Sequence, residues 1–120
     1  MNFCWVTLQV MNLEEALSFY NGVLGLQVIS RHSGNGIEMA MLGEENQAKI
    51  ELLQNTVSEK KVLHSDISIG IAVESLEDTM VYLKSRNIPI LRGPIAPNSH
   101  TRFIFIKDPQ GYEVQLVELS

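Results

Sequence analysis

A chain of 120 residues, 45% hydrophobic and 19% charged, has the size and composition of one folded domain, which excludes a disordered protein. Its apolar runs are all shorter than the about 20 residues that span a bilayer, so we expect no membrane partner. The net charge of -5 and the pI near 5.1 argue against nucleic acid, because phosphate binding needs clustered positive charge.

The first ten residues, MNFCWVTLQV, predict a strand in a cytoplasmic protein. They have no basic start and no small-residue cleavage site, so we do not interpret them as a signal peptide. The single cysteine, Cys4, allows no internal disulfide and is typical of a reducing compartment. Because Cys4 alternates with Val6 and Leu8, we expect its thiol to be buried.

The first half of the chain predicts the order strand, helix and three strands. Period-two alternation over residues 3–10 puts Trp5, Thr7 and Gln9 on one face and apolar side chains on the other. Asn12 is a typical helix N-cap, and Gly25 a typical stop, so residues 13–24 should be helical. The three further strands are expected at residues 26–32, 37–42 and 48–53.

The second half repeats this order after a polar linker over about residues 55–65. Its expected elements are a strand at 66–73, a helix at 76–86 opened by Ser75, a short strand at 88–91, a loop at 93–100 and a hairpin at 102–118. The hairpin turns at Asp108-Pro109-Gln110-Gly111, where proline presets φ and glycine allows a positive φ.

The two halves can be superimposed as sequences. Leu8 matches Ile71 and Val10 matches Val73, a shift of 63 residues. This repeat predicts one α+β domain of two βαβββ modules, over about residues 1–54 and 66–120, in pseudo-twofold pairing as a cup-shaped mixed sheet. The concave faces would line a cup for a small organic ligand.

Several segments together resemble a known family. They are TLQVMNLEEALSFYNGVLGL, KIELL, VESLEDTMVYLKSRNI and RFIFIKDPQGYEVQLVE, and they are similar to the glyoxalase, bleomycin-resistance and extradiol-dioxygenase superfamily, also called vicinal oxygen chelate proteins. The resemblance covers nearly the whole chain. It implies the paired βαβββ fold, usually a homodimer, and in the enzymes a divalent metal in the cup.

The resemblance also implies four metal-ligand positions, which fall here on Trp5, Glu51, Ser68 and Gln115. Indole, hydroxyl and carboxamide groups are poor ligands for a transition metal, so only Glu51 is a good one. We therefore predict no metal site and no cofactor. A shifted site at the rim of the cup that uses His64 or His100 near Glu51 or Glu113 is the alternative.

The predicted ligand-binding residues share the expected cup or its rim. They are Trp5, Thr7, Gln9, Glu51, Ser68, His100, Arg102 and Gln115. Trp5 is either an aromatic floor for a ligand or a filler of the space a metal would occupy. Glu51 is either a site carboxylate, with a catalytic role as general base, or a structural partner of Ser68 and Gln115. Arg102 either pairs with an anionic ligand or holds the hairpin turn through Asp108.

These observations favour a small-molecule-binding protein of the glyoxalase/bleomycin-resistance type without the family's metal. The alternative is a lyase, isomerase or dioxygenase-like enzyme with a non-standard metal site or metal-free acid–base chemistry at Glu51. A third hypothesis is an interaction domain whose cup is filled by its own side chains, with Trp5 as the plug.

Overall fold

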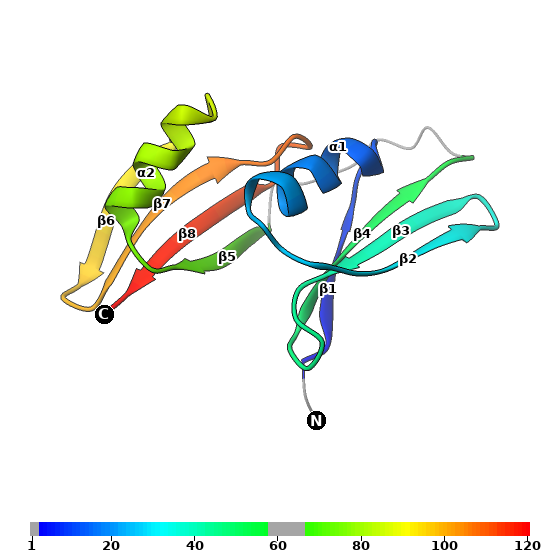
Figure 1. The fold of residues 1–120 in the computed structure, drawn as a ribbon, viewed down its shortest axis with the longest axis horizontal. Coiled ribbons are helices and arrows are strands. Elements are labelled where there is room, and N and C mark those ends of the chain that lie inside the picture. The colour runs from blue at the N-terminus through cyan, green and yellow to red at the C-terminus, as the bar shows by residue number, and fades with distance from the viewer. Residues whose placement is uncertain (1–2, 58–66) are drawn as a thin grey trace. The chain divides into compact units, whose positions relative to one another are not determined.

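A computed structural model describes residues 3–57 and 67–120 of the chain (Figure 1). The chain divides into two compact units, Met1–Leu63 and His64–Ser120, which we call unit one and unit two. Most of the predicted linker lies outside the described residues, and the single-domain organisation stays a prediction. None of the described helices is long and apolar enough to cross a bilayer.

Unit one is a four-stranded mixed sheet with a helix on one face (Figure 1). Its strands stand in the order β1-β4-β3-β2, with β1 parallel to β4 and the other pairs antiparallel. The elements are β1 Trp5–Gln9, α1 Leu13–Leu17, the π-helix η1 Ser18–Val23, β2 Val28–Gly34, β3 Ile37–Leu42 and β4 Lys49–Asn55. The expected helix over 13–24 is thus present, with a π-helical second half.

Unit two has the same topology. Its strands stand in the order β5-β8-β7-β6, and β5 is parallel to β8. The elements are β5 Ser68–Val73, α2 Leu76–Ser85, β6 Arg92–Asn98, β7 Thr101–Lys107 and β8 Glu113–Leu119. Two βαβββ units with one sheet each confirm the predicted α+β class.

Each sheet has one face covered by its helix and one open face. In unit one the helix-side residues are fully buried, among them Leu8, Leu42 and Leu52. In unit two Ile104 and Leu116 are buried in the same way under α2. Burial of such side chains contributes roughly 1.5–3 kcal/mol each. The alternate residues of the same strands therefore form the open faces. Their side chains do not pack against the helix, so they are available to bind a ligand.

The last strand of each unit holds the start of its helix. In unit one the Leu13 N–H donates to Gln54 Oε1 at 2.8 Å. In unit two the Leu76 N–H donates to Glu118 Oε2 at 2.6 Å. Asn12 and Ser75 cap the same helices by accepting from the backbone three residues on, as their sequence patterns predict. The repeat therefore extends from the sequence to individual hydrogen bonds.

The segment before the C-terminal hairpin differs from the prediction. Residues 88–91 are not a strand, and the expected loop at 93–100 is instead the strand β6. The cause is its position at the sheet edge: β6 pairs only with β7, with an irregular register. Pro94 and Pro97 are tolerated there, because an edge strand can leave N–H positions without ladder bonds.

Cys4 is also placed differently from the prediction. Its side chain is exposed, although Leu8 and Val10 in the same phase are buried. The β1–β4 register begins at Trp5 and Lys49, and the Cys4 carbonyl accepts the Lys49 N–H at 3.0 Å, so Cys4 lies at the very end of the ladder. Alternation alone cannot tell where along a strand the covering layer ends.

Candidate ligand-binding site

The open face of unit one brings together the site residues that the sequence places on β1 and β4. In the parallel register Trp5 lies beside Lys49, Thr7 beside Glu51 and Gln9 beside Leu53. Met41 of β3 lies on the other side of Glu51. Side chains opposite each other in a ladder project to the same face. Trp5, Thr7, Gln9 and Glu51 thus form one continuous surface.

Glu51 has a hydrogen-bond donor on its own sheet. The Thr7 hydroxyl donates to Glu51 Oε1 at 2.8 Å. Glu51 is half-buried, between Thr7 and Met41. The sequence placed Thr7 and Glu51 on one face without pairing them, since a parallel register cannot be read from either strand alone. The carboxylate is therefore held in a defined orientation by Thr7.

A cleft of about 500 Å³ opens at the Trp5 end of this face. Its wall includes Phe3, Trp5, Ile29 and Met41, and its rim is the loop at 45–48. Lys49 fixes that rim, because its ammonium donates to the carbonyls of Glu45 at 2.8 Å and Gln47 at 3.0 Å. The cleft has the volume of a small-molecule site, about 300–1,000 Å³.

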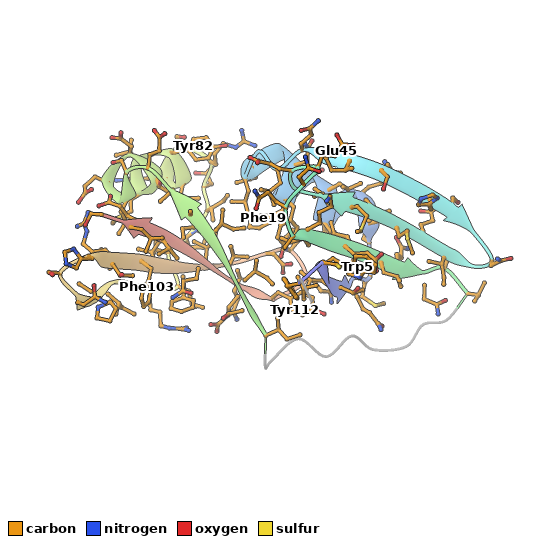
Figure 2. All side chains as sticks on the ribbon, turned by 90° about the horizontal axis from the view of Figure 1, so that it is seen from below. Trp5, Phe19, Glu45, Tyr82, Phe103 and Tyr112 are labelled. Atoms are coloured by element: carbon orange, nitrogen blue, oxygen red, sulfur yellow. The ribbon has the colours of Figure 1, made fainter. Side chains whose placement is uncertain are left out.

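Trp5 presents an accessible aromatic surface to this cleft. Half of its surface, 50%, is exposed, and the side chain lies on β1 (Figure 2). An indole with one free face can stack on a planar ligand or bury an apolar one. The cleft leaves room for a ligand against Trp5, and both interpretations of this residue stay predictions.

The open face of unit two carries Ser68 and Gln115. Ser68 pairs with Glu113, while Gln115 lies between Gly70 of β5 and Phe105 of β7. A methyl group at Gly70 would lie 3.8 Å from Gln115 Oε1, so the amide extends over the glycine. Gln115 is therefore a neutral polar group on this face, beside the aromatic ring of Phe105.

An arginine–aromatic cluster completes this face, and the sequence analysis missed it. The Arg92 guanidinium stacks on the Phe105 ring at 3.9 Å and donates to Glu113 Oε1 at 2.5 Å. Phe103, which packs edge-on against Phe105, projects from the side of the sheet opposite α2 (Figure 2). The sequence predicts a loop over residues 93–100. A loop has no alternating pattern, so it does not show on which face of the sheet the neighbouring Arg92 lies.

The ion pair in this cluster alters the titration of both partners. The hydrogen bond from Arg92 lowers the pKa of Glu113, against a smaller opposing effect of burial. The hydrogen bond to Glu113 in turn raises the pKa of Arg92. Glu113 therefore stays ionised, and the cluster carries no net charge.

Arg102 does not lie on the open face, which corrects its place among the predicted site residues. It is in phase with Ile104 and Ile106, so it projects to the helix side. There it donates to Glu77 at 2.7 Å and to Glu118 at 3.2 Å. The hydrogen bond from Arg102 lowers the pKa of Glu77. Arg102 thus holds α2 on the sheet.

The alternative partner of Arg102, Asp108, is occupied by the backbone. Its Oδ1 accepts the N–H groups of Gln110, Gly111 and Tyr112 at 2.9, 2.8 and 2.7 Å. Arg102 pairs with Glu118 at one end of the β7–β8 ladder, whereas the turn follows the Lys107–Glu113 pair at the other end, so the prediction that Arg102 holds the turn through Asp108 is wrong. The three backbone hydrogen bonds to the aspartate stabilise the turn.

His100 is also away from the other site residues of unit two. It lies in the turn between β6 and β7, where its carbonyl accepts the N–H of Ser120. Ser68 pairs with Glu113 at the start of β8, and Thr101 pairs with Leu119 at its end. Six residues of strand span about 20 Å. His100 and Ser68 are thus at opposite ends of the sheet.

Within residues 3–57 and 67–120, no group of three or more His, Cys, Asp and Glu side chains is arranged to hold a metal ion. The structure places Trp5 and Glu51 on the open face of unit one, and Ser68 and Gln115 on that of unit two. Each face thus contributes two of the four positions that the resemblance implies.

The two βαβββ units and their open sheet faces define a glyoxalase-like fold. The chain belongs to the glyoxalase/bleomycin resistance protein/dioxygenase superfamily, whose family model matches residues 3–116. Among curated proteins it is similar to a probable lactoylglutathione lyase of Synechocystis sp., with 27% identity over 121 residues that cover 94% of this chain and 92% of the relative.

Solved structures with this fold include an enzyme and a binding protein. Leishmania major glyoxalase I has a TM-score of 0.80 and 21% identity, with coverage of 98% of this chain and 86% of that one. The antibiotic-binding protein TnmS3 from a Streptomyces species has a TM-score of 0.77 and 16% identity, with coverage of 100% and 97%. At such identities the likeness shows the fold alone.

Proposed function

We propose that this protein binds a small, largely apolar organic ligand on its open sheet faces and does not use the divalent metal of the family's enzymes. The observation that carries the proposal is the chemistry at the four implied ligand positions. Glu51 is the one carboxylate among them, and its Oε1 already accepts the Thr7 hydroxyl at 2.8 Å. Trp5 stands where the resemblance implies the first ligand.

The donor set does not fit a transition-metal site. Such sites use imidazole, thiolate or carboxylate ligands, typically three or more. The indole of Trp5 offers a donor N–H and no lone pair, and Ser68 and Gln115 offer only neutral oxygens. The proposed function therefore includes no metal-dependent step.

The ligand class follows from the groups around Trp5. The indole and the thioether of Met41 supply an apolar, adaptable wall, and the cleft has room for a molecule of several rings, at about 500 Å³. Ser30, Glu45 and Gln47 are polar residues of the cleft lining, and Glu51 lies next to Met41 on the same open face. A planar ligand with a hydroxyl or amine donor directed at Glu51 suits this surface best.

An enzymatic function at Glu51 is the second candidate. Lactoylglutathione lyases are among the similar proteins, and Glu51 keeps a carboxylate on the open face. Metal-free chemistry would use Glu51 as a general base on a carbon acid within hydrogen-bond distance. An assay with the hemithioacetal of methylglyoxal and glutathione, run on the native protein and on Glu51→Gln, tests this. Equal rates for the two proteins contradict a general-base role.

The proposal also includes a cytoplasmic homodimer. Membership of the superfamily supports the dimer, and the single cysteine supports a reducing compartment. Light scattering on the purified protein should give twice the chain mass of 13.5 kDa. A monomer at micromolar concentration contradicts this part of the proposal alone.

Metal content is the direct test of the main proposal. The native protein, dialysed against Zn²⁺ or Ni²⁺ and then against metal-free buffer, should retain well under one equivalent per chain. The matched variant Trp5→His/Ser68→His/Gln115→Glu restores the ligand types that the family implies and should retain about one equivalent. A native protein that holds a full equivalent and loses it when Glu51 becomes Gln contradicts the proposal.

Ligand binding can be followed through Trp5, because it is the only tryptophan of the chain. Indole fluorescence titrated with bleomycin, catechols and S-lactoylglutathione should be quenched saturably by at least one aromatic compound. In calorimetry, Trp5→Phe should still bind that compound, with reduced affinity. Glu51→Gln should have reduced affinity only for compounds that carry a hydrogen-bond donor. Calorimetry that detects no binding across the panel contradicts the predicted ligand class.

A further inference from the structure

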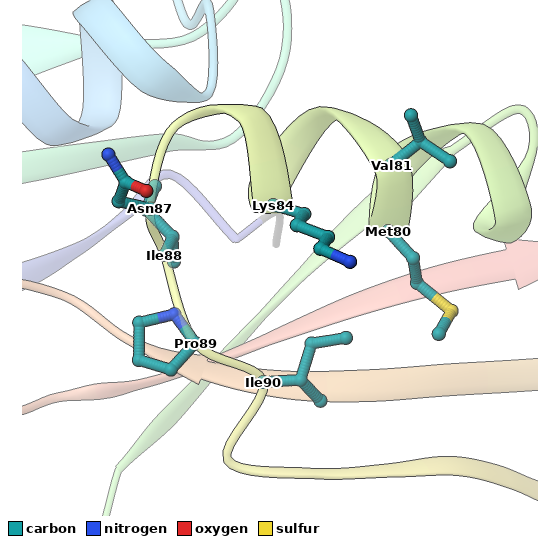
Figure 3. Close-up of a pocket in the computed structure, with 7 residues that line it drawn as sticks. All are labelled: Met80, Val81, Lys84, Asn87, Ile88, Pro89 and Ile90. Carbon is teal, nitrogen blue, oxygen red and sulfur yellow. The ribbon is translucent and has the colours of Figure 1, made fainter.

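A second concave surface lies on unit two, away from its open face. It is a groove of about 690 Å³ between the last turns of α2 and the chain that leaves the helix. Its lining is Met80, Val81, Lys84, Asn87, Ile88, Pro89 and Ile90. We call this the α2 groove (Figure 3). Its volume is within the range of about 300–1,000 Å³ for small-ligand sites.

The α2 groove combines an apolar wall with one cation. Met80 and Lys84 extend from α2 toward Ile90, so the lysine stem runs along the apolar wall (Figure 3). Met80, Ile88 and Ile90 are only half-buried, and 71% of Val81 is exposed. In the part of the chain that the structure describes, the Lys84 ammonium takes part in no ion pair or hydrogen bond.

Unit one provides an internal comparison for this groove. Under the shift of 63 residues Val81, Ile88 and Ile90 correspond to Ser18, Gly25 and Gln27 of unit one. Unit one has leucine at the positions of Met80, Asn87 and Pro89, so unit two adds apolar side chains only at the positions of Val81, Ile88 and Ile90. Folding of a βαβββ unit does not require apolar side chains at these three positions, since unit one forms the same topology with Ser18, Gly25 and Gln27 there.

The lysine position differs between the units in the same way. Its counterpart is Asn21, whose Nδ2 donates to the Leu26 carbonyl at 2.8 Å and so ties the helix end to the following chain. Lys84 makes no such bond and leaves the helix end held by backbone contacts, such as the Ile88 N–H to the Leu83 carbonyl at 3.0 Å. At this position unit one has a side-chain hydrogen bond that holds the helix end, and unit two has a cation beside an apolar groove.

From these contacts we infer that the α2 groove is a binding site for an amphipathic carboxylate, with the apolar part along Met80, Ile88 and Ile90 and the carboxylate at the Lys84 ammonium. An apolar ligand buries the exposed wall, which is favourable in proportion to the area removed from water. An anionic head group pairs with Lys84, whereas a cationic one is repelled. This site does not depend on the proposed function.

Decanoate and its neutral match decan-1-ol test the site. With isotope-labelled full-length protein, decanoate should shift the amide resonances of Met80, Lys84, Ile88 and Ile90 saturably. Its Kd should be about two- to fivefold lower than that of decan-1-ol, the gain of a partly exposed ion pair. Lys84→Met should remove this preference and leave decan-1-ol binding unchanged, while Lys84→Arg should keep it.

Lys107→Met is the matched control, since it removes the same charge from an exposed strand end of the same unit. It should leave the preference for decanoate as it is. The inference is overturned if decanoate shifts only resonances near Trp5, or if it shifts none. It is also overturned if Lys84→Met and Lys107→Met change the preference equally.

Discussion

Replacing Asp108 with alanine should destabilise unit two through the turn between β7 and β8. Asp108 is 5% exposed, and one of its oxygens accepts three backbone N–H groups. The Tyr112 N–H is buried, so its loss of an acceptor costs about 1–3 kcal/mol. The other two groups are part-buried and can bind water instead. We expect a total loss of roughly 2–4 kcal/mol in the free energy of unfolding.

Asp108→Asn separates the hydrogen bonds from the charge. The amide oxygen can still accept the three N–H groups, and neutral bonds are about half as strong as charge-assisted ones. The expected loss for this variant is about 1 kcal/mol. Asp78→Ala, an exposed acidic residue in the first turn of α2, is the control and should cost at most about 1 kcal/mol.

Urea unfolding followed by far-ultraviolet circular dichroism gives these free energies, and thermal midpoints should fall by about 4 °C per kcal/mol. The order of stability should be native, then Asp108→Asn, then Asp108→Ala. If Asp108→Ala is as stable as Asp108→Asn, the three N–H groups find other acceptors and the reasoning is refuted.

Two further predictions concern the free energy of unfolding, one for substitutions at two glycines and one for its dependence on pH. Gly93→Ala should cost about 1–3 kcal/mol, because φ is +106° and the new methyl would lie 2.9 Å from the Phe103 carbonyl oxygen. Gly22→Ala, whose new methyl would have no atom within 4 Å, should instead raise the free energy of unfolding by about 0.5–1 kcal/mol in the same urea assay. Changes of the same sign for the two glycine variants would contradict this prediction. Arg92 lowers the pKa of Glu113 from its ordinary 4.5, so their pair stabilises the folded state above that pH and the gain is lost as pH falls through the lower folded value. Unfolding free energy measured from pH 5 downward should thus decline less steeply in Arg92→Met than in the native protein, and parallel curves would show that the pair contributes nothing.

The elements set by local chemistry could be predicted from the sequence. Asn12 and Ser75 mark the helix starts because an N-cap acts within three residues. Alternation likewise identified the faces of β1, β4 and β8. The sequence repeat predicted the α+β class, which the two βαβββ units of the structure confirm. The same alternation could have placed Arg102 on the helix side, since it is in phase with the buried Ile104 and Ile106.

The features that depend on pairing between distant strands could not be predicted. The Thr7–Glu51 hydrogen bond joins residues 44 apart and depends on the parallel register of β1 and β4. The Arg92–Phe105 stack depends on β6, whose glycine and prolines are typical of a loop unless its edge position is known. Sequence reasoning found the residues of each face but not their contacts.

The parallel pairing within each unit has a consequence for folding during synthesis. Every ladder partner of β1 lies in β4, which ends at Asn55, so all strand pairs of unit one are available before β5 has been made. Until β4 emerges, however, β1 has no partner, and it must wait while 44 residues are added. At translation rates of about 5–20 residues per second, this delay is a few seconds. During that interval the apolar side of β1 is exposed on the nascent chain, and unpaired apolar strands of this kind are prone to aggregation.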